Sequence, residues 1–109
     1  MLRTVALDPV FKALADPRRR WFIEAMLDGQ VRLLKFAEMF PITLPTVLHH
    51  LGILEECGLL FSRKEGPMRL YSIRPDGLLE AEKWLRGILW GGYKPKLGSL
   101  PEDWSLRRR

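Results

Sequence analysis

The stretch Thr43-Leu-Pro-Thr-Val-Leu-His-His-Leu-Gly-Ile-Leu-Glu-Glu-Cys-Gly58 decides the fold of this chain. Within it, Val47, Leu51 and Leu54 recur at intervals of four and three residues, which places them on one face of a helix. The threonine that opens the stretch is a favourable N-cap, and the glycine that closes it is typical of a helix C-terminus. The pattern therefore predicts a helix that packs one face on a core and leaves the opposite face free.

A shorter helix is expected immediately before this one. Apolar side chains recur over residues 33–40, and Pro41 ends that segment. Two helices joined by so short a break are typical of a helix-turn-helix. Upstream, Asp8-Pro9 and Asp16-Pro17 each place a capping carboxylate before a proline at the first helical position, so we expect two further helices to begin there.

The character of the sequence changes after Gly58. Residues 59–63 and 68–73 are expected to form two strands joined by a turn. Pro75-Asp76 is expected to open a last helix, which Gly91-Gly92 ends. The expected fold class is therefore α+β and mainly helical, a winged helix-turn-helix in which four helices are followed by a β-hairpin wing and a final helix.

The length of the chain fits one small domain. It has 109 residues, of which 47% are hydrophobic, enough for a packed core. We expect residues 1–90 to form a winged helix domain for DNA binding and dimerisation. Residues 91–109 are expected to form an irregular extension, docked either on that domain or on a partner subunit.

Three stretches resemble the ArsR-type family of winged helix transcriptional repressors, and together they span about residues 8–90. The first is Phe11-Lys-Ala-Leu-Ala-Asp-Pro-Arg-Arg-Arg20, which is similar to the opening of the family's domain. The second is the helix quoted above with its exit to Leu60, and the third is Arg63-Lys-Glu-Gly-Pro-Met-Arg-Leu-Tyr71, which is similar to the wing. The resemblance implies a homodimeric repressor that binds double-stranded DNA and reads it with that helix.

The candidate DNA contacts lie at the start of this recognition helix and in the wing. Helix-turn-helix proteins insert the N-terminal part of the helix into the major groove, where hydroxyls reach phosphates or base edges and apolar groups touch thymine methyls. Cations in the wing suit the DNA backbone or the adjacent minor groove. The expected contacts are Thr43, Leu44, Pro45, Thr46, His49, His50, Arg63, Lys64 and Arg69. Thr43 could instead serve only as the N-cap, and His50 could be packed or capping.

Lysine and arginine are absent from segment 36–61, which holds the recognition helix, although the whole chain carries a net charge of +5. The helix therefore lacks the Arg or Lys that makes the commonest contact with guanine. Leu48 also stands where the family commonly has Ser, and Gly52 where it often has Lys. These departures support a rival hypothesis, a winged helix that binds a protein and not DNA; RNA binding ranks third.

The first and last expected helices carry more apolar surface than a small core can cover. In ArsR-like proteins these two helices form a two-fold interface, so the resemblance implies a homodimer. The expected interface residues are Val10, Phe11, Leu14, Leu78, Leu85 and Ile88. The alternative is that these side chains complete the core of a monomer.

Metal sensing and catalysis find little support in the sequence. Cys57 is the one cysteine, and the two histidines, His49 and His50, are adjacent, so on a helix they point about 100° apart and cannot chelate one ion together. The chain has no Gly-rich phosphate loop and no nucleophile motif. We expect no enzymatic activity, no cofactor, no metal and no membrane span, a cytoplasmic location, and room for a small-molecule effector of unidentified chemistry.

Overall fold

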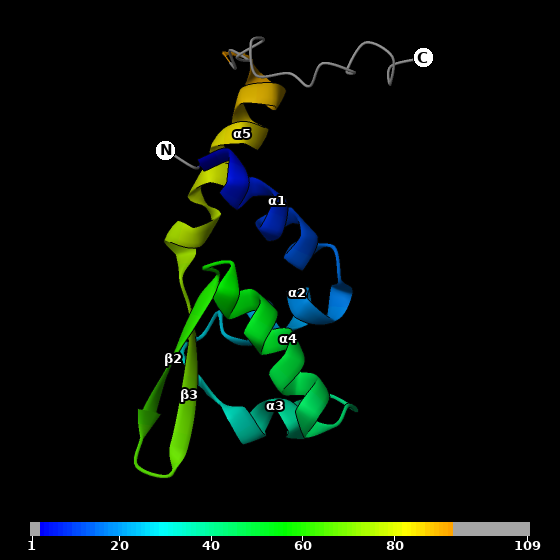
Figure 1. Ribbon diagram of the computed structural model, residues 1–109, viewed down its shortest axis with the longest axis vertical. Coiled ribbons are helices and arrows are strands. Elements are labelled where there is room, and N and C mark those ends of the chain that lie inside the picture. The colour runs from blue at the N-terminus through cyan, green and yellow to red at the C-terminus, as the bar shows by residue number, and fades with distance from the viewer. Residues whose placement is uncertain (1–2, 93–109) are drawn as a thin grey trace.

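The computed structural model describes residues 3–92 of the chain. Figure 1 shows α1 and α5 together at one end of the molecule, and α3 and the turn between β2 and β3 at the other. The order of elements confirms the winged helix-turn-helix fold class: α1 (Arg3–Leu14), α2 (Pro17–Ala25), β1 (Val31–Arg32), α3 (Leu33–Met39), α4 (Leu44–Glu56), β2 (Leu60–Glu65), β3 (Met68–Ile73), the short 3-10 helix η1 (Pro75–Leu78) and α5 (Leu79–Trp90).

The core lies where α2, α3 and α4 meet the sheet. The ring of Phe22 on α2 lies 5.2 Å from that of Phe36 on α3, and both side chains are fully buried. Val47, Leu51 and Leu54 of α4 are at most 1% exposed, which confirms that these three residues face the core. Burying apolar side chains of this size contributes about 1.5–3 kcal/mol each, so this face fixes how α4 sits on the domain.

The sheet has three antiparallel strands in the order β1-β3-β2. The two long strands, β2 and β3, form the expected hairpin, with Leu60 opposite Ile73 and Glu65 opposite Met68. The short strand β1 was not predicted, and it pairs with β3 through Val31 opposite Tyr71. A strand of two residues carries no periodicity that a sequence can display, so only its partner across the sheet defines it.

The predicted start of the first helix is wrong. Pro9 does not open α1 but lies inside it, because the helix already begins at Arg3. Asp8 and Pro9 are exposed, and Pro9 has no N–H to donate to the preceding turn of the helix. The start of the last helix also differs from the prediction, because Pro75 opens the short 3-10 helix η1 and α5 itself begins four residues later.

Most of the expected C-terminal extension lies outside the described residues. The structure describes Gly91 and Gly92, and Gly91 caps α5 with a φ of 87°. That left-handed conformation favours glycine, so the predicted end of the last helix is confirmed. The expectation that residues 93–109 dock on the domain or on a partner remains a prediction.

Candidate nucleic-acid interface

The N-terminus of α4 is organised by two threonines. The side chain of Thr43 caps the helix by accepting a hydrogen bond from the backbone N–H of Thr46 at 3.4 Å. The two hydroxyl oxygens are 3.0 Å apart, so one hydroxyl donates to the other. Thr43 therefore has the N-cap role, and its exposed hydroxyl stands at the positive end of the helix dipole, where phosphates bind readily.

One face of α4 is turned to solvent over its first turns. Pro45 and His49 are exposed, as predicted for residues that could enter a groove, whereas Leu44 and Thr46 are half-buried. The same face also carries Leu48, which is 43% exposed and was not among the predicted contacts. Helical periodicity could have indicated this, because residues three positions apart, such as Pro45 and Leu48, lie on the same face of a helix.

His50 does not belong to this face. Only 3% of its surface is exposed, and its ring lies edge-on to Phe22 at 5.9 Å. The expectation that His50 contacts DNA is therefore wrong, and the packed alternative holds. The reason is geometric: neighbouring residues on a helix point about 100° apart, so when His49 faces solvent, His50 turns toward the core.

The buried ring of His50 is bonded to Arg19. The Nη1 of Arg19 lies 3.2 Å from the Nδ1 of His50, and an arginine can only donate, so Nδ1 accepts and Nε2 carries the proton. The Nε2 atom is buried and has no hydrogen-bond partner among the described residues. Arg19 also donates to the carbonyl of Ala13 at 2.8 Å and lies 3.6 Å from Asp16, so it joins α1, α2 and α4.

We predict that stability falls in mild acid because of His50. Burial, aided by the positive charges of Arg18 and Arg19, lowers the pKa of His50 below its usual 6.5, and the opposing carboxylate of Asp16 does not cancel this. Below about pH 6.5, His50 therefore binds a proton more readily in the unfolded chain than in the folded chain, and the free energy of unfolding decreases. Urea unfolding between pH 8 and 5 measures this loss.

The matched variant for this prediction is His50→Gln, which keeps an acceptor for Arg19 and cannot titrate. We expect its stability to vary less over that pH range than that of the wild type. Asp16, whose pKa is held low mainly by the backbone N–H of Arg18, stabilises the fold above its usual pKa of 3.8, and that contribution is lost only at lower pH. Equal slopes for wild type and variant between pH 8 and 5 would show that His50 is not the titrating group.

Two of the three predicted DNA contacts in the wing form hydrogen bonds with other side chains of the protein. Arg63 on β2 donates to the carboxylate of Glu65 at 2.8 Å and to the side chain of Gln30 at 3.2 Å. Arg69 on β3 donates to the hydroxyl of Ser62 at 3.2 Å, and that hydroxyl donates to Glu55 of α4. These bonds are exposed, so their net contribution to stability is small.

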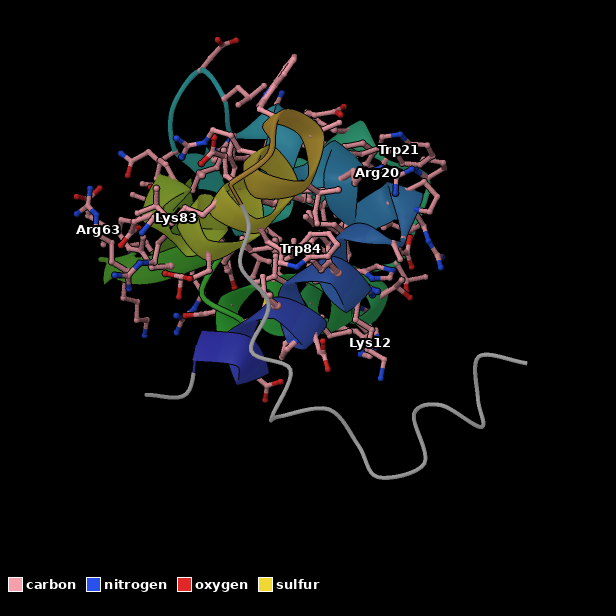
Figure 2. All side chains as sticks on the ribbon, turned by 90° about the horizontal axis from the view of Figure 1, so that it is seen from above. Lys12, Arg20, Trp21, Arg63, Lys83 and Trp84 are labelled. Carbon is pink, nitrogen blue, oxygen red and sulfur yellow. The ribbon has the colours of Figure 1, made fainter. Side chains whose placement is uncertain are left out.

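Lys64 differs from the other two cations of the wing. It is exposed, and it has no hydrogen bond or ion pair within residues 3–92. Its ammonium is therefore the most available charge on the hairpin. Figure 2 shows the neighbouring Arg63 pointing away from the body of the molecule, on the side opposite Lys12 of α1.

Most of the predicted dimer-forming residues gather on one apolar surface of α1 and α5. Phe11 and Leu14 of α1 and Leu78 and Leu85 line a groove of about 420 Å³ there. Ile88 does not line the groove, but it lies three residues after Leu85 on α5 and is 54% exposed. The C-terminal turn of α5 adds two exposed apolar residues to the lining of this groove, Leu89 and Trp90.

Val10 departs from that group. It is 3% exposed and belongs to the hydrophobic core of its own protomer together with Ala13. The prediction that it lines the dimer interface is wrong, because α1 turns its Val10 side inward and presents Phe11, which packs edge-on against Trp84 of α5 at 6.0 Å.

Solved structures of other proteins share this fold. The crystal structure of an ArsR family transcriptional regulator superposes with a TM-score of 0.73 at 29% identity, covering 84% of this chain and 96% of that one. The chain is also similar to the transcriptional repressor SdpR of Bacillus subtilis, with 30% identity over 83 residues, which are 76% of this chain and 92% of SdpR. The chain belongs to the ArsR family of transcriptional regulators. The resemblance expected from the sequence is thereby confirmed, although no family model matches it.

A further relative bears on how ArsR family proteins assemble. The solution structure of a homodimeric winged helix-turn-helix DNA-binding domain from Mycobacterium bovis, a possible ArsR-family regulator, has a TM-score of 0.65 and 27% identity to this ArsR family chain. The match covers 75% of this chain and 78% of that one. These relatives are transcriptional regulators.

Within residues 3–92, no three side chains of His, Cys, Asp or Glu come together as metal ligands. No helix of that part is long and apolar enough to cross a membrane. The prediction that the protein works without a metal stays a prediction.

Proposed function

We propose that this ArsR family protein is a homodimer that binds specific DNA sequences in the cytoplasm and represses transcription. One observation carries the proposal. The start of α4 and the tip of the wing lie at one end of the molecule, and the apolar surface of α1 and α5 lies at the other (Figure 1). Two copies joined through α1 and α5 would leave both recognition helices free for adjacent half-sites.

The contacts we propose at the DNA are those the structure leaves accessible. Thr43, Pro45 and His49 of α4 are exposed, Thr46 is half-buried beside the helix N-terminus, and Lys64 stands free on the wing. Because the helix carries no cation, hydroxyl, imidazole and apolar contacts supply the base reading, and the wing supplies attraction to phosphate. Leu44, which is half-buried, and Arg63 and Arg69, which are exposed but bonded to other side chains, also remain in the proposed set.

The double variant Thr46→Ala, His49→Ala tests the recognition helix. We expect its affinity for duplexes that the wild type selects from a random pool at physiological salt to fall by about tenfold or more, because each lost contact with a base edge costs about 1–3 kcal/mol. Fluorescence anisotropy measures the affinity. Binding to an unrelated duplex and the thermal midpoint should hardly change. Undiminished affinity for the selected duplexes would show that another surface reads DNA.

The variant Lys64→Ala tests the wing. We expect it to bind selected and unrelated duplexes with similarly reduced affinity and to lower the slope of log affinity against log salt by about 1, as loss of one phosphate contact requires. The matched control is Lys83→Ala on α5, which should leave the slope as it is, since this lysine pairs with Glu80 far from the wing. If the wild type binds no DNA duplex but retains a protein partner at high salt, the result would support the rival hypothesis of a protein-binding winged helix.

A further inference from the structure

A cavity of about 570 Å³ opens between α1 and the C-terminal half of α4. This volume falls in the range of sites that hold small organic molecules. Pro9 and Ala13 of α1 and Ile53 of α4 supply apolar walls. The cavity lies on the opposite side of α1 from Phe11 and Leu14, since residues 9, 12 and 13 and residues 11 and 14 occupy opposite faces at about 100° per residue. A dimer formed through α1 and α5 would therefore leave it open.

The charged groups of the cavity favour an anion. Arg19 and Lys12 face it against a single carboxylate, that of Glu56. The Arg19 side chain is 13% exposed and is held in place by the carbonyls of Ala13 at 2.8 Å and Lys12 at 3.3 Å. The Nη2 of Arg19 carries two N–H groups and donates to one acceptor, the carbonyl of Lys12, so a second N–H is left for a ligand.

Lys12 is the second cation among the residues that line the cavity. Its ammonium has no hydrogen bond or ion pair to any residue that the structure describes, and Figure 2 shows the side chain extending outward from α1. Cys57, which also lines the cavity, adds no charge at neutral pH because burial raises the pKa of its thiol above 9.0. A carboxylate near Lys12 and Arg19, with its hydrocarbon part toward the apolar walls, matches this distribution.

We propose that the cavity between α1 and α4 binds a small monoanion with a short hydrocarbon body, of the class of medium-chain carboxylates. Such a ligand touches α1, which carries the dimer-forming surface, and α4, which carries the recognition face. It also touches Arg19, whose guanidinium is bonded to His50 on the buried side of α4. Occupancy is therefore coupled to DNA affinity, and this second part rests on the proposed function.

Hexanoate, a carboxylate with a short hydrocarbon chain, is the probe for the test. Cys57 can report its binding, because this residue lies in the cavity and is the one thiol of the chain. We expect saturable binding of hexanoate by calorimetry, with a dissociation constant at or below about 1 mM. Saturating hexanoate should slow alkylation of Cys57 by N-ethylmaleimide about tenfold at ten times that constant. Hexan-1-ol and hexylamine, which match its length without the negative charge, should bind at least about fivefold more weakly.

Lys12→Gln is the decisive variant. It should weaken hexanoate binding about fivefold and keep the wild-type thermal midpoint, whereas Lys83→Gln should bind like the wild type. Absence of saturable binding, equal binding of the three probes, or an unchanged affinity in Lys12→Gln each overturns the proposal. These measurements need no DNA, so they stand even if the proposed function fails.

The coupling to DNA has its own test. Saturating hexanoate should change the affinity for the selected duplex at least about threefold, and the duplex should change hexanoate affinity by the same factor, since linkage is reciprocal. If hexanoate binds but neither factor departs from one, the cavity is a binding site without regulatory effect, and the second part of the proposal is overturned.

Discussion

The variant Gly77→Ala is expected to lose about 3 kcal/mol of folding free energy, the largest loss we predict for the addition of a single methyl group. A Cβ atom at Gly77 would overlap the carbonyl oxygen of Gly58 and would lie 2.8 Å from the Gly58 carbonyl carbon and 3.3 Å from the Cα of Leu59. All three are backbone atoms, so no side chain can rotate away. The 3-10 helix η1 has to move off the turn between α4 and β2.

That turn cannot easily give way. Gly58 has a φ of 82°, and its N–H donates to the carbonyl of Glu55 at 3.1 Å. Leu59 on its other side is 1% exposed and is bonded through its carbonyl to the N–H of Arg74 at 2.9 Å. We therefore expect the thermal midpoint, followed by circular dichroism, to fall by about 15 °C, from the usual 4–8 °C per kcal/mol in a domain of this size.

Gly52→Ala is the matched control. It adds the same methyl group inside α4, where a Cβ atom meets nothing within 4 Å. The change should stabilise the fold by up to about 1 kcal/mol, because alanine favours a helix over glycine. A Gly77→Ala protein that melts with the wild type, or a Gly52→Ala protein that loses as much stability, would contradict the proposed close approach.

The second large effect is expected from Leu85→Glu, Ile88→Glu on α5. Leu85 and Ile88 are 44% and 54% exposed, so the change should hardly disturb the protomer, but two charges per copy would be buried in a dimer formed through α1 and α5. We expect a monomer by analytical ultracentrifugation. Affinity for the selected duplex should fall about a hundredfold, because each recognition helix then binds its half-site without the other.

The control for this variant places a glutamate on another exposed apolar side chain. Leu27 follows α2, is 70% exposed and does not line the groove between α1 and α5. Leu27→Glu should sediment as the wild type does. A dimer that survives Leu85→Glu, Ile88→Glu, with unchanged DNA affinity, would place the dimer interface elsewhere and leave the apolar surface of α1 and α5 without this role.

The sequence predicted those parts of the fold whose signal is local. The recognition helix shows its buried face through Val47, Leu51 and Leu54, and the N-cap and the closing glycine mark its ends. The hairpin is visible for the same reason, since alternation and turn residues lie side by side in the chain. These are also the elements that carry most of the candidate DNA contacts.

What the sequence missed depends on segments far apart in the chain. The stripe of Val47, Leu51 and Leu54 places His50 on the buried side of α4, but only the fold shows that its partners are Phe22 and Arg19 of α2. Val10 was placed on the dimer surface because its apolar character alone cannot tell one face of α1 from another. The cavity has no sequence signature, because residues of three helices far apart in the chain line it.

The strand order sets when the domain can be completed during its synthesis. β3 lies between β1 and β2, and its Tyr71 pairs with Val31 of β1 and Ser62 of β2. A ribosome delivers residues from the N-terminus at about 5–20 per second, so α1 to α4 emerge before the central strand exists. Until it arrives, Phe36 lacks the Tyr71 ring that covers it at 6.1 Å. The nascent helical segment therefore exposes part of its core for several seconds and is most open to aggregation or chaperone binding at that stage.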